Sequence, residues 1–133
     1  MTVKVLIVED EMLVAADLEA SLEELGFQPI GVAADRESAL RLAEERPDVA
    51  LVDVNLLDGP TGPEIGRQLA RDYDVAVVFV TANPGQVLPG PPETLGVMSK
   101  PCDPVSVGLL VAYALGCRHG QPVPPPRGLL TFH

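Results

Sequence analysis

The chain has 133 residues, of which 47% are hydrophobic and 21% are charged. This length and composition are typical of one globular domain with its own core, and they argue against extended disorder and against a multidomain arrangement. The formal net charge of −10 repels nucleic-acid phosphates and anionic lipid, so we expect no direct nucleic-acid binding and no membrane binding.

The sequence carries no recognisable signal for export or for a membrane span. Cys102 and Cys117 show neither a paired disulfide framework nor the spacing of metal ligands, which indicates a reducing compartment. The first residues run directly into a strand pattern without the segments of a signal peptide. Residues 105–117 form the longest apolar stretch, which is shorter than the roughly 20 residues that a bilayer requires. We therefore expect a cytoplasmic protein.

The first predicted element is a strand over residues 3–8, an almost continuous run of apolar and β-branched residues that ends at Glu9 and Asp10. A helix is predicted next, because apolar residues recur at helical spacing between residues 14 and 25. Gly26 then supplies its end.

The second and third units repeat the order of strand and helix. A strand is predicted over residues 30–33, followed by a helix that Asp35 caps and that ends before Pro47. The third strand, over residues 49–52, ends at Asp53, and a glycine- and proline-rich loop then leads into another helix.

The clearest strand covers residues 75–80 and ends at Thr81. Four prolines among residues 84–92 cannot all lie inside a regular helix, so we expect a loop there with at most a short helical piece. A fifth strand over residues 95–98 then leads to Lys100.

The last predicted helix is capped by Asp103 and begins at Pro104. The polyproline-like segment that follows is expected to be mobile or docked in extended form, and it is a candidate ligand for a proline-reading partner. The predicted division is a folded domain over residues 1–119 and a proline-rich tail over residues 120–133.

Five strand–helix units in a row predict an α/β fold with a doubly wound, five-stranded parallel sheet and a reduced fourth helix. Right-handed crossovers place all strand carboxyl ends at one edge of the sheet. In the flavodoxin-like strand order 2-1-3-4-5, ligands bind between the first and third strands, where Asp10 and Asp53 would lie.

Three carboxylates at this edge predict a divalent cation, because converging acids are costly unless a cation neutralises them. Mg²⁺ prefers oxygen ligands and typically takes one or two protein carboxylates. We assign Asp10 and Asp53 as direct ligands, the backbone carbonyl of Asn55 as a further ligand, and Glu9 as a ligand through water. A solvated acidic loop is the alternative.

Lys100 and Thr81 complete the parts of a phosphoryl-transfer site on the same edge. A carboxylate accepts a phosphoryl group only when neighbouring groups offset the charge on the transferring oxygens. The Lys100 ammonium and the Thr81 hydroxyl would do so around Asp53. The pattern therefore predicts that Asp53 is reversibly phosphorylated.

Together these motifs resemble the receiver domain of two-component response regulators over about residues 3–118. The matching residues are Val-Glu9-Asp10-Glu, Leu-Val-Asp53-Val-Asn-Leu, Val-Thr81-Ala and Ser-Lys100-Pro101. The resemblance implies a CheY-like fold, bound Mg²⁺ and a cis Lys100-Pro101 peptide. It also implies that Asp53 receives its phosphoryl group from a histidine kinase or a phosphotransfer protein. Such a domain catalyses only its own phosphorylation and dephosphorylation.

Two departures from the family pattern stand out. Val97 occupies the position of a frequent aromatic residue, so an aromatic switch on this strand is excluded. The proline-broken segment that follows Asn83-Pro84, with Asp58-Gly59, is similar to receivers of general stress regulators that mimic a sigma factor. Those regulators carry an output domain ahead of the receiver, whereas we expect a stand-alone receiver here. Its output would be contact with an unidentified protein or with a second copy of the chain.

Two other functions stay open at this point. A degenerate receiver would bind partners without being phosphorylated, which Val97 and the broken helix favour. A haloacid-dehalogenase-like phosphatase also combines an aspartate, a lysine and an acid pair. That phosphatase places the nucleophile first in an Asp-x-Asp pattern, whereas Glu9 and Asp10 come first here and Asp53-Val-Asn55 lacks the second aspartate. The order of the residues therefore argues against the phosphatase.

Overall fold

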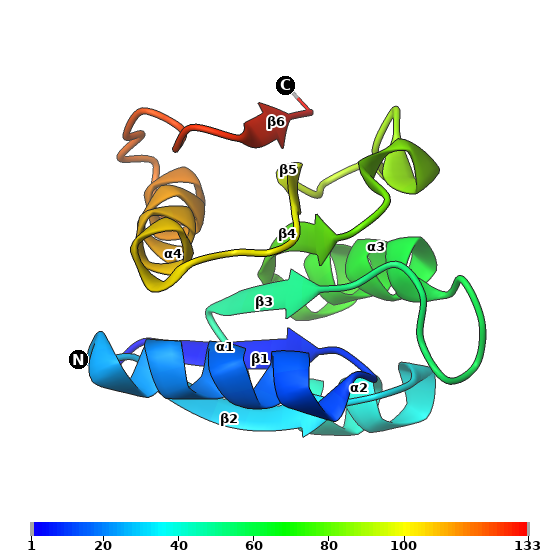
Figure 1. Cartoon of the computed structure of the whole chain (residues 1–133). Coiled ribbons are helices and arrows are strands. Elements are labelled where there is room, and N and C mark those ends of the chain that lie inside the picture. The colour runs from blue at the N-terminus through cyan, green and yellow to red at the C-terminus, as the bar shows by residue number, and fades with distance from the viewer. Residues whose placement is uncertain (1, 133) are drawn as a thin grey trace.

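A computed structural model describes residues 2–132 as one α/β domain (Figure 1). The elements, in chain order, are β1 (Lys4–Val8), α1 (Met12–Glu24), β2 (Gln28–Ala33), α2 (Arg36–Ala43), β3 (Val49–Val52), α3 (Gly62–Tyr73), β4 (Ala76–Thr81), the 3-10 helix η1 (Pro84–Val87), β5 (Gly96–Ser99), α4 (Pro104–Arg118) and β6 (Leu129–Thr131).

The strands form a single sheet in the order β2-β1-β3-β4-β5-β6. The first five are parallel, which confirms the predicted order 2-1-3-4-5. The sixth strand, β6, pairs antiparallel with β5 and adds one strand to the five that were predicted.

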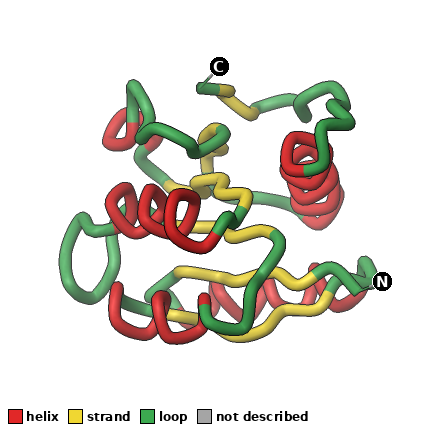
Figure 2. Tube along the Cα trace, turned by 180° about the vertical axis from the view of Figure 1, so that it is seen from behind, coloured by secondary structure: helices red, strands yellow, loops and turns green. Residues whose placement is uncertain are grey.

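Two apolar layers cover the sheet, one on each face. Helices α2 and α3 with η1 pack on one face, around the fully buried ring of Phe79. Helices α1 and α4 pack on the other face. Figure 2, seen from behind, turns the face with α2 and α3 toward the viewer. Because both faces of β1, β3 and β4 are covered, their residues are almost all buried, as the near-continuous apolar runs predicted.

Side-chain caps begin two of the helices, as the sequence predicted. The Asp35 carboxylate accepts a hydrogen bond from the Ser38 N–H at 2.9 Å, and the Ser38 hydroxyl oxygen accepts one from the Asp35 N–H at 3.4 Å, which forms a capping box before α2. The Asp103 carboxylate accepts from the Ser106 N–H at 2.7 Å at the start of α4.

The proline-rich segment between β4 and β5 contains only the four-residue η1, which confirms the predicted loop with a short helical piece. Val87 on η1 is buried against the sheet. The Lys100-Pro101 peptide is cis, as the family resemblance implied, and so is Leu88-Pro89.

The carboxyl-terminal segment leaves α4, runs along an exposed proline-rich stretch and returns to the sheet as β6. Its Phe132 side chain packs against the core layer that contains Phe79. Among residues 2–132, no helix combines the length and the apolar character that crossing a membrane demands.

Candidate functional site

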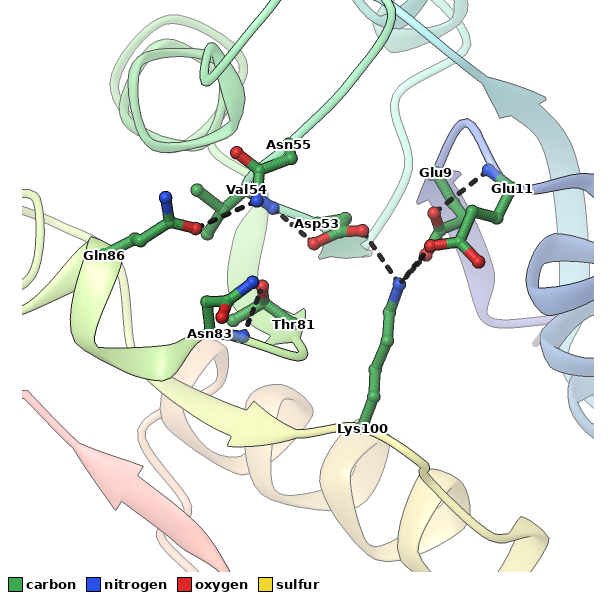
Figure 3. Close-up of polar contacts among 9 residues, drawn as sticks. All are labelled: Glu9, Glu11, Asp53, Val54, Asn55, Thr81, Asn83, Gln86 and Lys100. Carbon is green, nitrogen blue, oxygen red and sulfur yellow. Dashed lines mark hydrogen bonds and ion pairs between the residues drawn. The ribbon is translucent and has the colours of Figure 1, made fainter.

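The carboxyl ends of four adjacent strands bring the predicted site residues together. Glu9 and Asp10 follow β1, and Asp53 follows β3. Thr81 closes β4, and Lys100 follows β5. Since these strands are parallel neighbours, their last residues meet at one edge of the sheet, where Figure 3 shows Glu9, Asp53, Thr81 and Lys100 around a common space.

Lys100 lies at the centre of this group, with its ammonium between two carboxylates (Figure 3). Its Nζ lies 2.6 Å from Glu9 Oε1 and 2.8 Å from Asp53 Oδ2. Glu11 Oε1 lies farther away, at 3.9 Å from the same nitrogen. The Lys100 side chain is only 13% exposed, so these ion pairs are shielded from solvent more than surface pairs are.

The environment shifts the pKa values of both Glu9 and Lys100. Burial raises the pKa of the Glu9 carboxyl above its ordinary value, although hydrogen bonds from Lys100 and Glu11 oppose the shift. Burial alone would lower the pKa of Lys100, but its hydrogen bonds to Asp53 and Glu9 outweigh that effect and leave the pKa raised. Lys100 therefore stays charged at neutral pH and supplies the positive charge of the site.

The Asp53 carboxylate is held in a fixed orientation that faces the site. Oδ1 accepts a hydrogen bond from the Val54 N–H at 2.6 Å, and Oδ2 accepts one from Lys100. The residue is 6% exposed, at the margin between the buried strand β3 and the loop. The predicted acceptor thus points at Lys100 and away from the apolar layers.

Asp10 joins Glu9 and Asp53 in an acidic group that suits a hard cation. One carboxylate oxygen from each of the three residues lies within 4.8 Å of the others. Oxygen donors at this spacing fit Mg²⁺ or another hard divalent ion. Glu9 is buried, and its Oε2 accepts a hydrogen bond from the Glu11 N–H at 3.1 Å, which fixes its side chain.

Thr81 and Asn55 line a cavity at this edge of the sheet, together with Asp53 and Lys100. The cavity measures about 170 Å³ and is lined by Asp10, Glu11, Asp53, Asn55, Thr81, Ala82, Asn83 and Lys100. The Thr81 hydroxyl accepts a hydrogen bond from the Asn83 N–H at 3.2 Å, which ties it to the loop after β4. The Asn55 side chain donates to Gln86 Oε1 on η1 at 2.9 Å.

Several contacts of this site were missed by sequence reasoning. Glu11 lies near Lys100 in the structure, and it was not assigned to the site from the sequence. Its position directly after Glu9 and Asp10 was a signal in the sequence that could have placed it there. The bonds from Asn83 to Thr81 and from Asn55 to Gln86 had no such signal, because they depend on the path of the loop.

Comparison with known proteins identifies a family and a set of relatives. The family model of the response regulator receiver domain matches residues 5–90. The phyllosphere-induced regulator PhyR of Methylorubrum extorquens is 41% identical over 118 residues, which cover 86% of this chain and 44% of PhyR. The chain therefore spans less than half the length of this curated relative.

Solved structures of PhyR proteins have the same fold. The response regulator PhyR from Brucella abortus matches with a TM-score of 0.78 and 32% identity, over 90% of this chain and 50% of that chain. The anti-anti-sigma factor PhyR from Bartonella quintana gives 0.78 and 30%, over 90% and 50%. The receiver domain of PhyR from Erythrobacter litoralis gives 0.73 and 30%, over 94% and 95%.

Proposed function

The chain belongs to the response regulator receiver domain family, and from this membership we propose that it accepts a phosphoryl group on Asp53 and passes the signal on by protein contact. One observation carries the proposal: the Lys100 ammonium lies 2.8 Å from Asp53 Oδ2, with two further acids beside it. We place this exchange in the cytoplasm, because Cys102 and Cys117 are both free thiols.

In the proposed reaction, an Asp53 carboxylate oxygen attacks the phosphorus of a phosphohistidine on a kinase or phosphotransfer protein. A phosphorus–oxygen bond forms, the phosphorus–nitrogen bond breaks, and the imidazole leaves with the electron pair and takes up a proton. The Lys100 ammonium moves from its two carboxylates toward the new phosphoryl oxygens, where it offsets their charge.

The acidic group supports a bound Mg²⁺. Asp10 and Asp53 would hold the ion directly, the Asn55 backbone carbonyl would add a ligand, and Glu9 would contact it through water. When bound, the ion supplies electrostatic stabilisation of the transferring phosphoryl group. The ion pair between Glu9 and Lys100 fits this outer role, because it already engages one Glu9 oxygen.

Thr81 lies between Asp53 and the loop that follows β4, so it could pass a change at Asp53 to that loop. In the described state its hydroxyl accepts from the Asn83 N–H. A phosphoryl group on Asp53 offers that hydroxyl a strong acceptor, so Thr81 would turn toward it and release the loop. The phosphoryl group thereby favours one of two existing loop conformations.

A second candidate function is a receiver that binds partners without phosphorylation. Val97 favours it, because β5 carries no aromatic side chain at this position to report the state of Asp53. The contact between Asp53 and Lys100 favours the first function, since both side chains line the cavity.

Intact-mass measurement after incubation with Mg²⁺ and acetyl phosphate tests the proposal. We expect the wild type and the surface variant Asp72→Asn to retain one phosphoryl group each, and Asp53→Asn to retain none. Absence of an adduct on the wild type with every phosphodonor tried would reject phosphorylation in favour of the second candidate.

A further inference from the structure

The outer edge of β5 pairs with β6, the last strand of the chain (Figure 1). The pairs are Gly96 with Thr131, Val97 with Leu130, and Met98 with Leu129. We call residues 129–132 the strap, since they lie across an edge that would otherwise present unpaired backbone groups.

Two glycines make room for the strap. A Cβ atom at Gly96 would lie 2.5 Å from the Leu130 carbonyl oxygen, so only glycine lets the β6 backbone come this close. A Cβ atom at Gly90 would lie 2.5 Å from the Phe132 ring. The residues that contact the strap thus leave space for it on both β5 and the loop before β5.

Phe132 anchors the strap on the face of the sheet that η1 also covers. Its N–H donates to the Leu95 carbonyl at 3.0 Å, and its ring centroid lies 6.3 Å from that of Phe79 on β4. The ring packs against the apolar layer to which η1 contributes Val87. An aromatic side chain from the tail therefore joins the apolar layer to which η1 contributes.

One continuous segment connects the residues that contact Phe132 to the proposed phosphorylation site. Residues 82–95 follow Thr81, which lines the site cavity, and they include Gly90, which the Phe132 ring contacts. A turn of Thr81 toward a phosphorylated Asp53 would break the hydrogen bond from the Asn83 N–H at the start of this segment. A shift of the segment at Gly90 would then change the packing of the Phe132 ring and loosen the strap.

We propose that phosphorylation of Asp53 releases the strap and opens the β5 edge to an extended segment of a partner protein, which adds as an antiparallel strand. The strap itself defines the chemistry of that segment: an apolar residue for the position of Leu129, which packs against one apolar layer, and an aromatic residue for the position of Phe132, which packs against the other. This inference rests on the proposed function of Asp53.

Hydrogen exchange of the full chain tests the release. With acetyl phosphate and Mg²⁺, we expect the amides of residues 129–132 to exchange at least about tenfold faster, while those of β3 stay unchanged. Intact mass is read on the same samples. An adduct without faster strap exchange overturns this inference alone, whereas absence of the adduct overturns the proposed function and this inference together.

A synthetic peptide with the sequence of residues 127–133 tests the edge as a docking site. We expect the labelled peptide to bind the phosphorylated chain and the unphosphorylated variant Phe132→Ala at least about tenfold more tightly than the unphosphorylated wild type. Phe132→Ala provides the same release without altering β5, and it is the decisive variant. Gly85→Ala is the matched control, because a Cβ atom there meets open space.

Equal peptide binding by Phe132→Ala and the wild type would overturn the docking site, provided that the β3 amides of both stay protected. A phosphorylated chain that dimerises and excludes the peptide would assign the edge to a second copy, which would overturn the assignment to a partner protein.

Discussion

Lys100 determines the charge balance of the site. It joins the buried Glu9 and the proposed acceptor Asp53, so the same ammonium that would bind a phosphoryl group holds the unmodified carboxylates together. Removing such a partner leaves buried carboxylates without compensation, which is more costly than losing a surface ion pair.

Glu9 makes stability depend on pH in a direction opposite to that of most acids. Its folded-state pKa lies above the ordinary value of 4.5, chiefly because of burial. At pH values between the unfolded-state pKa and the folded-state pKa of Glu9, the folded chain binds more protons than the unfolded chain. The contribution of Glu9 to the unfolding free energy therefore decreases as the pH rises through 4.5.

We therefore expect the unfolding free energy of Glu9→Gln, relative to the wild type, to increase between pH 4 and pH 7. Urea unfolding at the two pH values measures this difference, and Glu23→Gln at an exposed position of α1 serves as the control. A difference that decreases over the same interval would show that Lys100, rather than burial, dominates the pKa of Glu9.

The start of α3 fixes the loop that carries Asp53. Gly62 donates its N–H to the Val54 carbonyl at 3.0 Å, and a Cβ atom at Gly62 would lie 2.6 Å from Val54 Cα and would also collide with the Asp53 carbonyl. This close approach needs the absence of a side chain. The geometry of Asp53 therefore depends on a helix terminus as well as on β3.

We expect Gly62→Ala to lower the unfolding free energy by roughly 1–3 kcal/mol, as overpacking does, and to slow phosphoryl uptake because the Asp53 loop must shift. Urea unfolding and the time course of the intact-mass adduct measure the two effects. Gly85→Ala, which meets open space, should leave both unchanged. Wild-type values for Gly62→Ala would show that the loop adapts without moving Asp53.

At the scale of the whole molecule, ligand binding to the folded state stabilises the entire chain. If Mg²⁺ binds Asp10 and Asp53, free Mg²⁺ at about 100 times its dissociation constant should raise the unfolding free energy by about 2.7 kcal/mol. Urea unfolding at constant ionic strength measures the gain. Asp10→Asn should lose most of it, and an equal gain in Asp10→Asn would remove Asp10 from the ligand set.

Much of this fold could be predicted from the sequence because its strands are buried on both faces. The apolar runs before Glu9, Asp53 and Thr81 have few alternatives, and parallel connections bring their ends to one edge. The polar residues at those ends therefore marked the site without coordinates.

The sixth strand could not be predicted, because Leu129–Thr131 is three residues long and shows no clear period. Its pairing depends on space at Gly96 and on the ring of Phe132, both of which are tertiary features. The contact between Lys100 and Glu9 was missed for a similar reason, since the direction of a long side chain depends on its neighbours.

The identity of the acceptor is the central claim, and borohydride reduction of the phosphorylated chain tests it most directly. Reduction converts an aspartyl phosphate to homoserine, which sequencing of the peptides by mass spectrometry then locates. The account predicts homoserine at position 53 and at no other aspartate, and none after treatment of Asp53→Asn. Homoserine at position 10, or an adduct that leaves position 53 unchanged, would contradict it.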